Sequence, residues 1–87
     1  MNCIFCAVVN KEIPAKILFE DDEVVAFSDI NPAAPTHILI VPRKHSDSLA
    51  STHDRDILAS LLVTARKLAS EMKMEDFRVV INNGSRA

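Results

Sequence analysis

Two cysteines and three histidines are the residues of this chain whose types and spacing could do chemistry. Cys3 and Cys6 form a Cys-x-x-Cys, and two cysteines three residues apart on a helix point the same way, so they could share a tetrahedral zinc ion. His45, which follows Arg43 and Lys44, is the third candidate ligand. The alternative is a pair of reduced thiols near a core face together with a surface histidine. At the level of sequence both interpretations stay open.

The histidines His37, His45 and His53 are expected on a strand, beyond its end and at the start of a helix. They therefore cannot line one strand edge as a catalytic cluster would. No serine or cysteine has a histidine and a carboxylate at a recognisable spacing, so these residues by themselves predict no nucleophilic catalysis. The single glycine, Gly84, excludes the glycine-rich phosphate loops of the Walker and Rossmann kinds.

Two polar residues at strand ends could contact a ligand. Asp29 follows a predicted strand and faces a proline-rich loop, where its carboxylate could accept hydrogen bonds from both hydroxyls of a ribose. The alternative is an Asx turn that begins the loop. Asn82 has the same ambiguity between a turn residue and a polar ligand contact.

Composition sets the class of protein. The chain has 87 residues, of which 48% are hydrophobic and 25% charged, which indicates one small folded domain rather than a disordered chain. Its net charge of -2 argues against binding nucleic acid through phosphates. No apolar run is long enough for a membrane span, and no secretory signal is visible. With two cysteines and no export signal, we expect a cytoplasmic protein.

The apolar periodicity predicts an α+β domain that must position these residues. Residues 3–11 are typical of a short helix that ends before Pro14. The strongest helical pattern covers residues 54–72, with Ser51 or Thr52 as its N-terminal cap. The expected strands, followed by a turn at 82–85, are 17–19, 24–27, 37–41 and 77–81, and the third of these has the pattern of a central strand covered on both faces.

The predicted long helix has one apolar face. Its members repeat at helical spacing, and we expect them to be buried. They are Ile57, Leu58, Leu61, Leu62, Ala65, Leu68, Ala69 and Met72.

Taken together, these segments resemble the histidine-triad (HIT) superfamily, and within it the Hint-like branch of purine nucleoside phosphoramidases. The resemblance runs in order through nearly the whole chain. The matching stretches are Cys3–Cys6, Lys11–Lys16, Phe19–Asp22, Ala26–Pro32, Ala34–His45 and Arg78–Ser85. It implies the HIT-like fold, an antiparallel sheet of about four strands with one long and one short helix.

The resemblance also implies what the sequence does not contain. The family continues after its Asn-x-Gly turn to a His-x-His-x-His strand, whose middle histidine attacks the α-phosphorus of a nucleotide and forms a nucleotidyl-histidine. This sequence has no such motif. We therefore expect a single, C-terminally truncated HIT domain over residues 1–87 that is inactive alone, with no catalytic residue of its own.

By resemblance, the nucleoside pocket and the zinc ligands do carry over. The apolar side chains of Phe5, Val8, Phe27 and Leu39 would sandwich the base. Ser28, Asp29 and Ile30 would border the ribose, with Asp29 accepting from its hydroxyls, and Asn82 would sit near the phosphate. Zinc-containing members are similar to this chain at the two cysteines and the histidine, so those three residues would form an incomplete structural site. The expected nucleotide-binding residues are Phe5, Val8, Phe27, Ser28, Asp29, Ile30, Leu39 and Asn82, and the expected metal ligands are Cys3, Cys6 and His45.

Three functions remain to be distinguished. The first is the N-terminal portion of a hydrolase of nucleoside phosphoramidates or dinucleotides, which needs no cofactor for catalysis. The second is a non-catalytic module that binds a purine nucleotide similar to AMP or GMP. The third is a dimerisation module that pairs through the long helix and the last strand, since similar full-length proteins are homodimers. Neither nucleic acid nor a membrane is expected as a partner.

Overall fold

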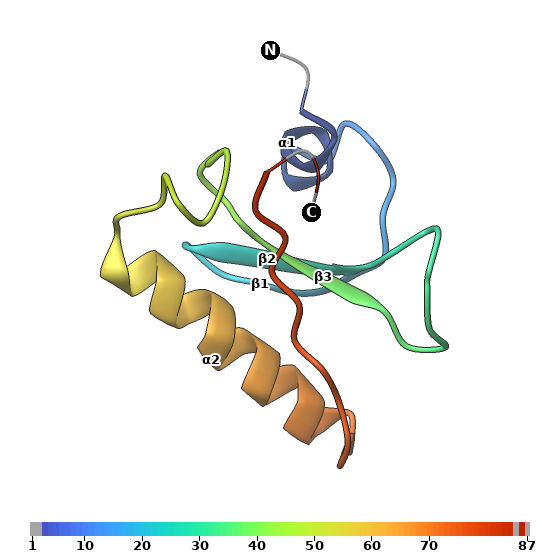
Figure 1. Cartoon of the computed structure of the whole chain (residues 1–87). Helices are drawn as coiled ribbons and strands as arrows, with labels where there is room; N and C mark the ends of the chain where they lie inside the picture. Colours follow the sequence, from blue (N-terminus) through green and yellow to red (C-terminus); the bar gives the residue numbers. More distant parts are fainter. Residues whose placement is uncertain (1–2, 85, 87) are drawn as a thin grey trace. The chain divides into compact units, whose positions relative to one another are not determined.

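The computed structural model describes residues 3–84 and residue 86 of the chain. It divides the chain into two compact units, Met1–His45 and Ser46–Ala87, here called the N-terminal and C-terminal units. The elements follow in the order α1 (Ile4–Val9), β1 (Ile17–Glu20), β2 (Val24–Ser28), β3 (Ile38–Pro42) and α2 (Arg55–Glu71) (Figure 1). Neither helix has the length and apolar character that a membrane crossing requires.

The N-terminal unit is built on an antiparallel sheet of three strands in the order β1-β2-β3 (Figure 1). The acidic turn between β1 and β2 is fixed by Asp21, whose carboxylate accepts hydrogen bonds from the backbone of Glu23 and Val24, both at 2.8 Å. Such a turn supplies the reversal that an antiparallel pair needs. The register of β2 and β3 places Val25 opposite Val41 and Phe27 opposite Leu39. The α+β prediction with strands at these three places is confirmed.

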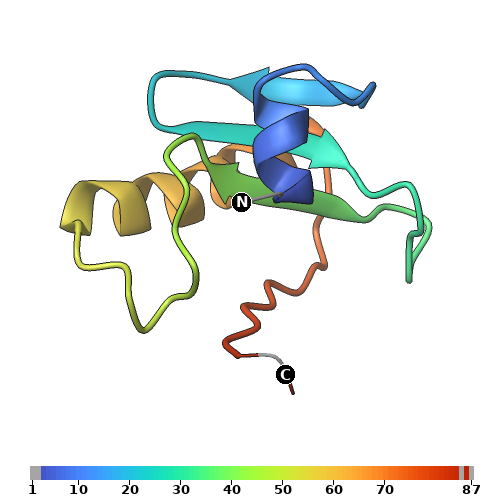
Figure 2. The ribbon, with the colours of Figure 1, turned by 90° about the horizontal axis from the view of Figure 1, so that it is seen from above.

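Helix α1 lies over one face of this sheet (Figure 2). Val8 and Val9 of α1 are buried against Val25 and Phe27. These two residues of β2 share a face because side chains alternate along a strand. The cluster is completed by half-buried Ala15, Ile17, Leu39 and Val41. This cluster is the hydrophobic core of the N-terminal unit.

The identity of the central strand differs from the expectation. The central strand is β2, of which Val24 to Phe27 are all buried, whereas β3 lies at an edge of the described sheet and its residues are half-buried. Both strands are apolar on both faces, so the pattern of single residues could not tell them apart. Order within a sheet is decided by pairing between distant segments, which a local pattern does not record.

In the C-terminal unit, α2 confirms the predicted long helix with a different cap. Asp54 is the N-cap residue, and its carboxylate accepts from the backbone of Asp56 at 2.9 Å and of Ile57 at 3.2 Å. Ser51 and Thr52, the expected caps, instead bond to Ser48 in the preceding turn. Of the expected apolar face, Leu68 and Ala69 are buried whereas Leu62 and Met72 are exposed, and Thr64 is buried although it was not expected to be.

The predicted strand at 77–81 is wrong for the described structure. The segment has no regular secondary structure, and its apolar residues Phe77, Val79, Val80 and Ile81 are exposed. A strand requires a hydrogen-bonded neighbour, and the three paired strands of the described residues do not include this segment. The sheet therefore has three described strands rather than about four. Of the turn predicted at 82–85, Ser85 lies outside the described residues.

Candidate functional site

The three predicted metal ligands come together in the N-terminal unit. Cys3 caps the start of α1, Cys6 lies one turn later, and His45 follows the end of β3. Their ligand atoms all lie within 4.8 Å of one another, and the Sγ of Cys6 is 3.2 Å from the Nδ1 of His45. Both cysteines are free thiols. The spacing in the sequence therefore identified a real cluster of one imidazole and two thiols.

Hydrogen bonding makes the two thiols unequal. The backbone N–H and the thiol of Cys6 donate to the Sγ of Cys3, which lowers the pKa of the Cys3 thiol from 9.0 to about 7. The hydrogen bond to Cys3 in turn raises the pKa of the Cys6 thiol, because its proton is held in that bond. One thiolate is thus stabilised by its neighbour, and thiolates are the form that binds metal.

The donor set and its spacing fit a zinc ion. Zinc favours sulfur and imidazole ligands, and at bond lengths of about 2.0–2.3 Å the ligand atoms of a tetrahedral site lie roughly 3.5–4 Å apart. In this structure the Sγ of Cys6 and the Nδ1 of His45 are 3.2 Å apart, and none of the three ligand atoms is more than 4.8 Å from another, so these distances are close to that separation. Three ligands are one fewer than a closed structural site uses.

The four apolar residues expected around a base also lie in the N-terminal unit. Phe5 of α1 is 43% exposed and stands over Phe27 of β2, which is 5% exposed, with their ring centroids 6.3 Å apart. Val8 packs in the same cluster, and Leu39 lies opposite Phe27 on the next strand. Three elements thus bring together one apolar surface that is buried on one side and open at Phe5.

The end of β2 carries the residues expected near a ribose. Ser28 is the last residue of β2, and Ile30, two residues later, is exposed. The Oδ1 of Asp29 accepts from the backbone N–H of Asn31 at 2.9 Å, which is the Asx turn given above as the alternative. Asp29 therefore stabilises the turn through Oδ1. Its other carboxylate oxygen, Oδ2, takes no part in that bond.

His37 lies next to that second oxygen. Its Nδ1 lies 3.6 Å from the Oδ2 of Asp29 and accepts a hydrogen bond from the backbone N–H of Ala33 at 3.0 Å. Because a nitrogen that accepts from an N–H carries no proton of its own, Nδ1 has none to donate to Asp29. His37 therefore stabilises the loop between β2 and β3 through hydrogen bonds to its backbone.

Asn82, the residue expected near a phosphate, belongs to the C-terminal unit and is exposed. The other seven predicted nucleotide-binding residues all belong to the N-terminal unit. Asn82 is therefore described only within its own unit.

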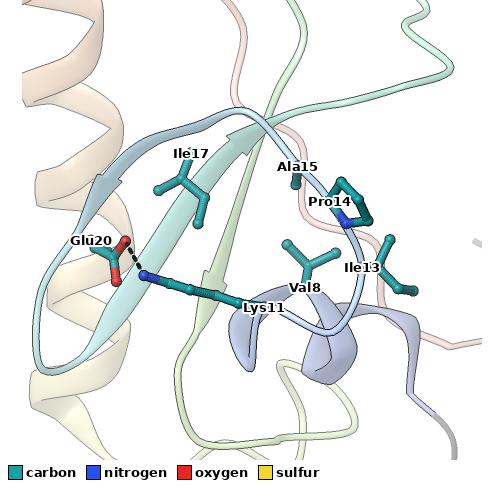
Figure 3. Close-up of a pocket in the computed structure, with 7 residues that line it drawn as sticks. All are labelled: Val8, Lys11, Ile13, Pro14, Ala15, Ile17 and Glu20. Atoms are coloured by element: carbon teal, nitrogen blue, oxygen red, sulfur yellow. Dashed lines mark ion pairs between the residues drawn. The ribbon is translucent and has the colours of Figure 1, made fainter.

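Sequence reasoning missed a shallow hollow of about 360 Å³ between the end of α1 and β1 (Figure 3). Five of its seven lining residues are apolar, and on one side the Nζ of Lys11 pairs with Glu20 at 3.5 Å (Figure 3). The lining residues are Val8, Lys11, Ile13, Pro14, Ala15, Ile17 and Glu20. It shares only Val8 with the predicted nucleoside pocket. The sequence predicted that the first helix ends before Pro14, but the hollow beside it depends on side-chain packing.

Comparison with known proteins decides the family. The HIT domain matches residues 10–87, which is most of the chain. The chain belongs to the HIT domain family. The resemblance drawn from the sequence motifs is thereby confirmed.

This HIT domain is similar to proteins of Zea mays and Arabidopsis thaliana. It is 46% identical to the 14 kDa zinc-binding protein of Zea mays over 93% of the chain and 67% of that protein. It is 44% identical to the adenylylsulfatase HINT1 of Arabidopsis thaliana over 93% of the chain, but over only 58% of that protein. Both relatives are longer than this chain.

The fold agrees with a solved structure. A histidine triad protein from Clostridium difficile superposes with a TM-score of 0.91 at 48% identity, covering 99% of this chain and 78% of that one. The α+β arrangement of this HIT domain is therefore that of its solved relatives.

Proposed function

We propose that this chain is the nucleoside-binding portion of a HIT-family hydrolase that acts on nucleoside phosphoramidates or dinucleotides. It binds a purine nucleotide similar to AMP or GMP and does not turn it over alone. The reaction of the lineage proceeds through a nucleotidyl-histidine. That step needs a histidine aimed at the α-phosphorus, and the 87 residues contain no His-x-His-x-His that could supply it.

The observation that carries this proposal is the meeting of Phe5, Phe27 and Leu39 next to the end of β2. An aromatic ring half open to solvent above a buried apolar cluster offers a surface on which a planar base can stack. The Oδ2 of Asp29 then accepts from the ribose hydroxyls, while its Oδ1 holds the turn. Ser28 and Ile30 border the sugar.

Calorimetry with AMP tests the binding. We expect weak but saturable binding by the whole chain, and a loss of about tenfold or more in affinity for Asp29→Ala, since a charged acceptor contributes roughly 1.5–3 kcal/mol. Asp22→Ala, which removes an exposed carboxylate of the acidic turn in the same unit, is the matched control. A folded sample that does not bind AMP would contradict the proposal.

Turnover is the second readout. We expect no hydrolysis of an adenosine phosphoramidate by the 87-residue chain, and hydrolysis once the C-terminal segment of a HIT-family relative is appended. Mass spectrometry of the chain must confirm its last residue, because a contaminating full-length homologue would mimic activity. An extended protein that folds and remains inactive would contradict the assignment to this hydrolase lineage.

A structural zinc ion forms part of the proposal. Cys3, Cys6 and His45 would hold it, and the three bonds to the ion would link the start of α1 to the segment after β3. Cobalt substitution tests this, because thiolate ligands give intense charge-transfer absorption. We expect those bands in the native chain and their loss in Cys6→Ser. A native chain without them would exclude the site.

A dimerisation module is the second candidate. The observation that favours it is the exposure of Leu62 and Val63 on α2 and of Met72 at its C-cap, together with the exposed apolar segment 77–81. Burying such surfaces is the common reason that proteins associate. Sedimentation of the purified chain tests it, and we expect a dimer or larger species. A well-folded monomer over the accessible concentration range would exclude this role.

We also propose a cytoplasmic location. The support is the pair of free thiols at Cys3 and Cys6, which persist where glutathione keeps cysteines reduced. Fractionation of the native source, followed by detection of the chain, tests the location. Recovery from an oxidising compartment would overturn it.

A further inference from the structure

Cys3 and Cys6 lie close enough to react with each other as well as with a metal ion. Cys3 is the N-cap residue of α1 and has an extended backbone (φ -107°, ψ 122°), and Cys6 follows in the first turn. Their sulfur atoms are no more than 4.8 Å apart, and the thiol of Cys6 donates a hydrogen bond to the Sγ of Cys3. A disulfide joins sulfurs at about 2 Å, and rotation of a cysteine side chain between staggered positions moves its sulfur by roughly 3 Å. Side-chain rotation can therefore close the gap.

The backbone of this turn is held independently of the two thiols. The backbone N–H of Ala7 donates to the carbonyl of Cys3 at 3.0 Å, and that of Asn10 donates to the carbonyl of Cys6 at 2.9 Å. On the other side of α1, Val8 and Val9 are buried in the core of the N-terminal unit. The fold thus keeps the two sulfurs near each other, and a reaction between two groups held in this way is favoured over reaction with a second molecule.

The pair is also accessible to small molecules. Both cysteines are half-buried, and the two residues between them, Ile4 and Phe5, are 60% and 43% exposed. Partly exposed thiols are the ones that exchange with small disulfides, whereas fully buried cysteines are inert. A tripeptide such as glutathione can therefore reach a sulfur of this turn.

We propose that Cys3 and Cys6 are a reversible dithiol–disulfide pair whose co-substrate is a small-molecule disulfide such as glutathione disulfide. The pair rests on the positions of the two sulfurs and is independent of nucleotide binding. One consequence rests on the proposed zinc site: the disulfide has no thiolate to offer a metal ion, so oxidation and metal binding exclude each other.

The exchange is a two-electron oxidation of the protein. One cysteine thiolate attacks a sulfur of glutathione disulfide, which forms a mixed disulfide and breaks the sulfur–sulfur bond of the oxidant. The second thiolate attacks the protein sulfur of the mixed disulfide and expels the other glutathione. Each departing glutathione thiolate takes up a proton that a cysteine thiol gave up, so the products are one protein disulfide and two reduced glutathiones. Excess reduced glutathione reverses both steps.

Intact-mass measurement after alkylation tests the pair, because the chain has two cysteines and their pairing is unambiguous. We expect the metal-free whole chain, treated with glutathione disulfide, to lose two hydrogen atoms and to take up no alkylating label. Excess reduced glutathione should restore two labelled thiols. Cys3→Ser and Cys6→Ser each keep one thiol, so each should stop at a mixed disulfide with one glutathione attached.

His45 separates the redox reaction from metal binding. His45→Ala leaves both thiols in place and should form the disulfide as the native chain does, so it is the matched control. Zinc at about ten times its dissociation constant leaves roughly one chain in ten free, so it should slow oxidation of the native chain about tenfold. At the same zinc concentration the protection of His45→Ala should be smaller, because one ligand is lost.

The outcomes separate two failures. A metal-free native chain that keeps two labelled thiols in glutathione disulfide, or that stops with glutathione attached, overturns the redox pair. Disulfide-linked dimers in place of the internal bond also overturn it, because the two sulfurs would then not be held together. An internal disulfide that forms at the same rate with and without zinc supports the pair and contradicts the zinc site of the proposed function.

Discussion

The N-terminal and C-terminal units differ in how they use their apolar residues. In the N-terminal unit, α1 and the sheet bury Val8, Val25 and Phe27 in one cluster, and all three strands are hydrogen-bonded. In the C-terminal unit, α2 satisfies its own backbone, while the apolar residues at 77–81 are exposed. Similar apolar sequences thus have opposite outcomes in the two units.

The difference teaches that a helix and a strand depend on different information. A helix closes its hydrogen bonds within its own residues, so Asp54 and an apolar repeat are enough to define α2. A strand requires a second segment, and β2 has one on each side. Residues 77–81 have the composition of a strand without a described partner.

The largest expected effect is on the free energy of unfolding, and it appears when a buried valine is compared with an exposed one. Val25 is 1% exposed in β2 and Val80 is 65% exposed in the extended segment. We expect Val25→Ala to lower the free energy of unfolding by about 2–3 kcal/mol, because it removes two buried methyl groups and leaves a cavity. Urea denaturation followed by circular dichroism measures it.

The matched change in the other unit sharpens this comparison. Val80→Ala should alter the free energy of unfolding by less than about 0.5 kcal/mol, as is usual for exposed positions. Equal losses for the two variants would show that residues 77–81 are buried in solution, and the contrast between the units would then be wrong.

Much of the fold could be predicted because its signals are local. A short helix before Pro14 was predicted, the apolar runs around Phe19, Val25 and Ile40 form strands, and the Cys-x-x-Cys led directly to the cluster with His45. Long-range facts were less accessible. The position of β3 at an edge, the lack of a partner for residues 77–81 and the bond from Ala50 to Asn83 each depend on segments distant in sequence.

The two helices end in the same way, which supplies the next prediction. Lys11 and Lys73 have φ values of 62° and 56°, and each follows a helix whose final carbonyls accept from it and from the next residue. These are Schellman motifs, in which glycine is the preferred residue. The sequence did not predict a left-handed lysine, because that conformation costs a residue with a side chain about 1–2 kcal/mol.

Replacing these lysines tests whether the two units respond alike. We expect Lys73→Gly to raise the free energy of unfolding by about 1 kcal/mol, since the steric cost outweighs the extra entropy that glycine loses on folding. Lys11→Gly should give slightly less, because it also removes the pair with Glu20 at 3.5 Å. Thermal unfolding measures both, and a destabilised Lys73→Gly would contradict the left-handed assignment.

The smallest expected effect concerns the charges at the edge of the N-terminal unit. Glu20 at the end of β1 lies 3.2 Å from the guanidinium of Arg43, which follows β3, and 3.5 Å from the Nζ of Lys11. The hydrogen bond from Arg43 lowers the pKa of Glu20 below its ordinary value of 4.5, and Lys11 acts in the same direction. Because the folded-state pKa is the lower one, the pair stabilises the fold above pH 4.5, and this contribution is lost as the pH falls through the folded pKa.

Titration of the Glu20 carboxyl by NMR measures this directly. We expect Arg43→Met to raise the midpoint toward that of an isolated glutamate, and Lys11→Met to raise it by less, because the hydrogen bond from Arg43 is the main cause of the shift. Both side chains are partly exposed, so added salt should weaken the contribution of Lys11 more than the direct bond from Arg43. If Lys11→Met raised the midpoint more than Arg43→Met did, the hydrogen bond from Arg43 would not be the main cause of the low pKa of Glu20.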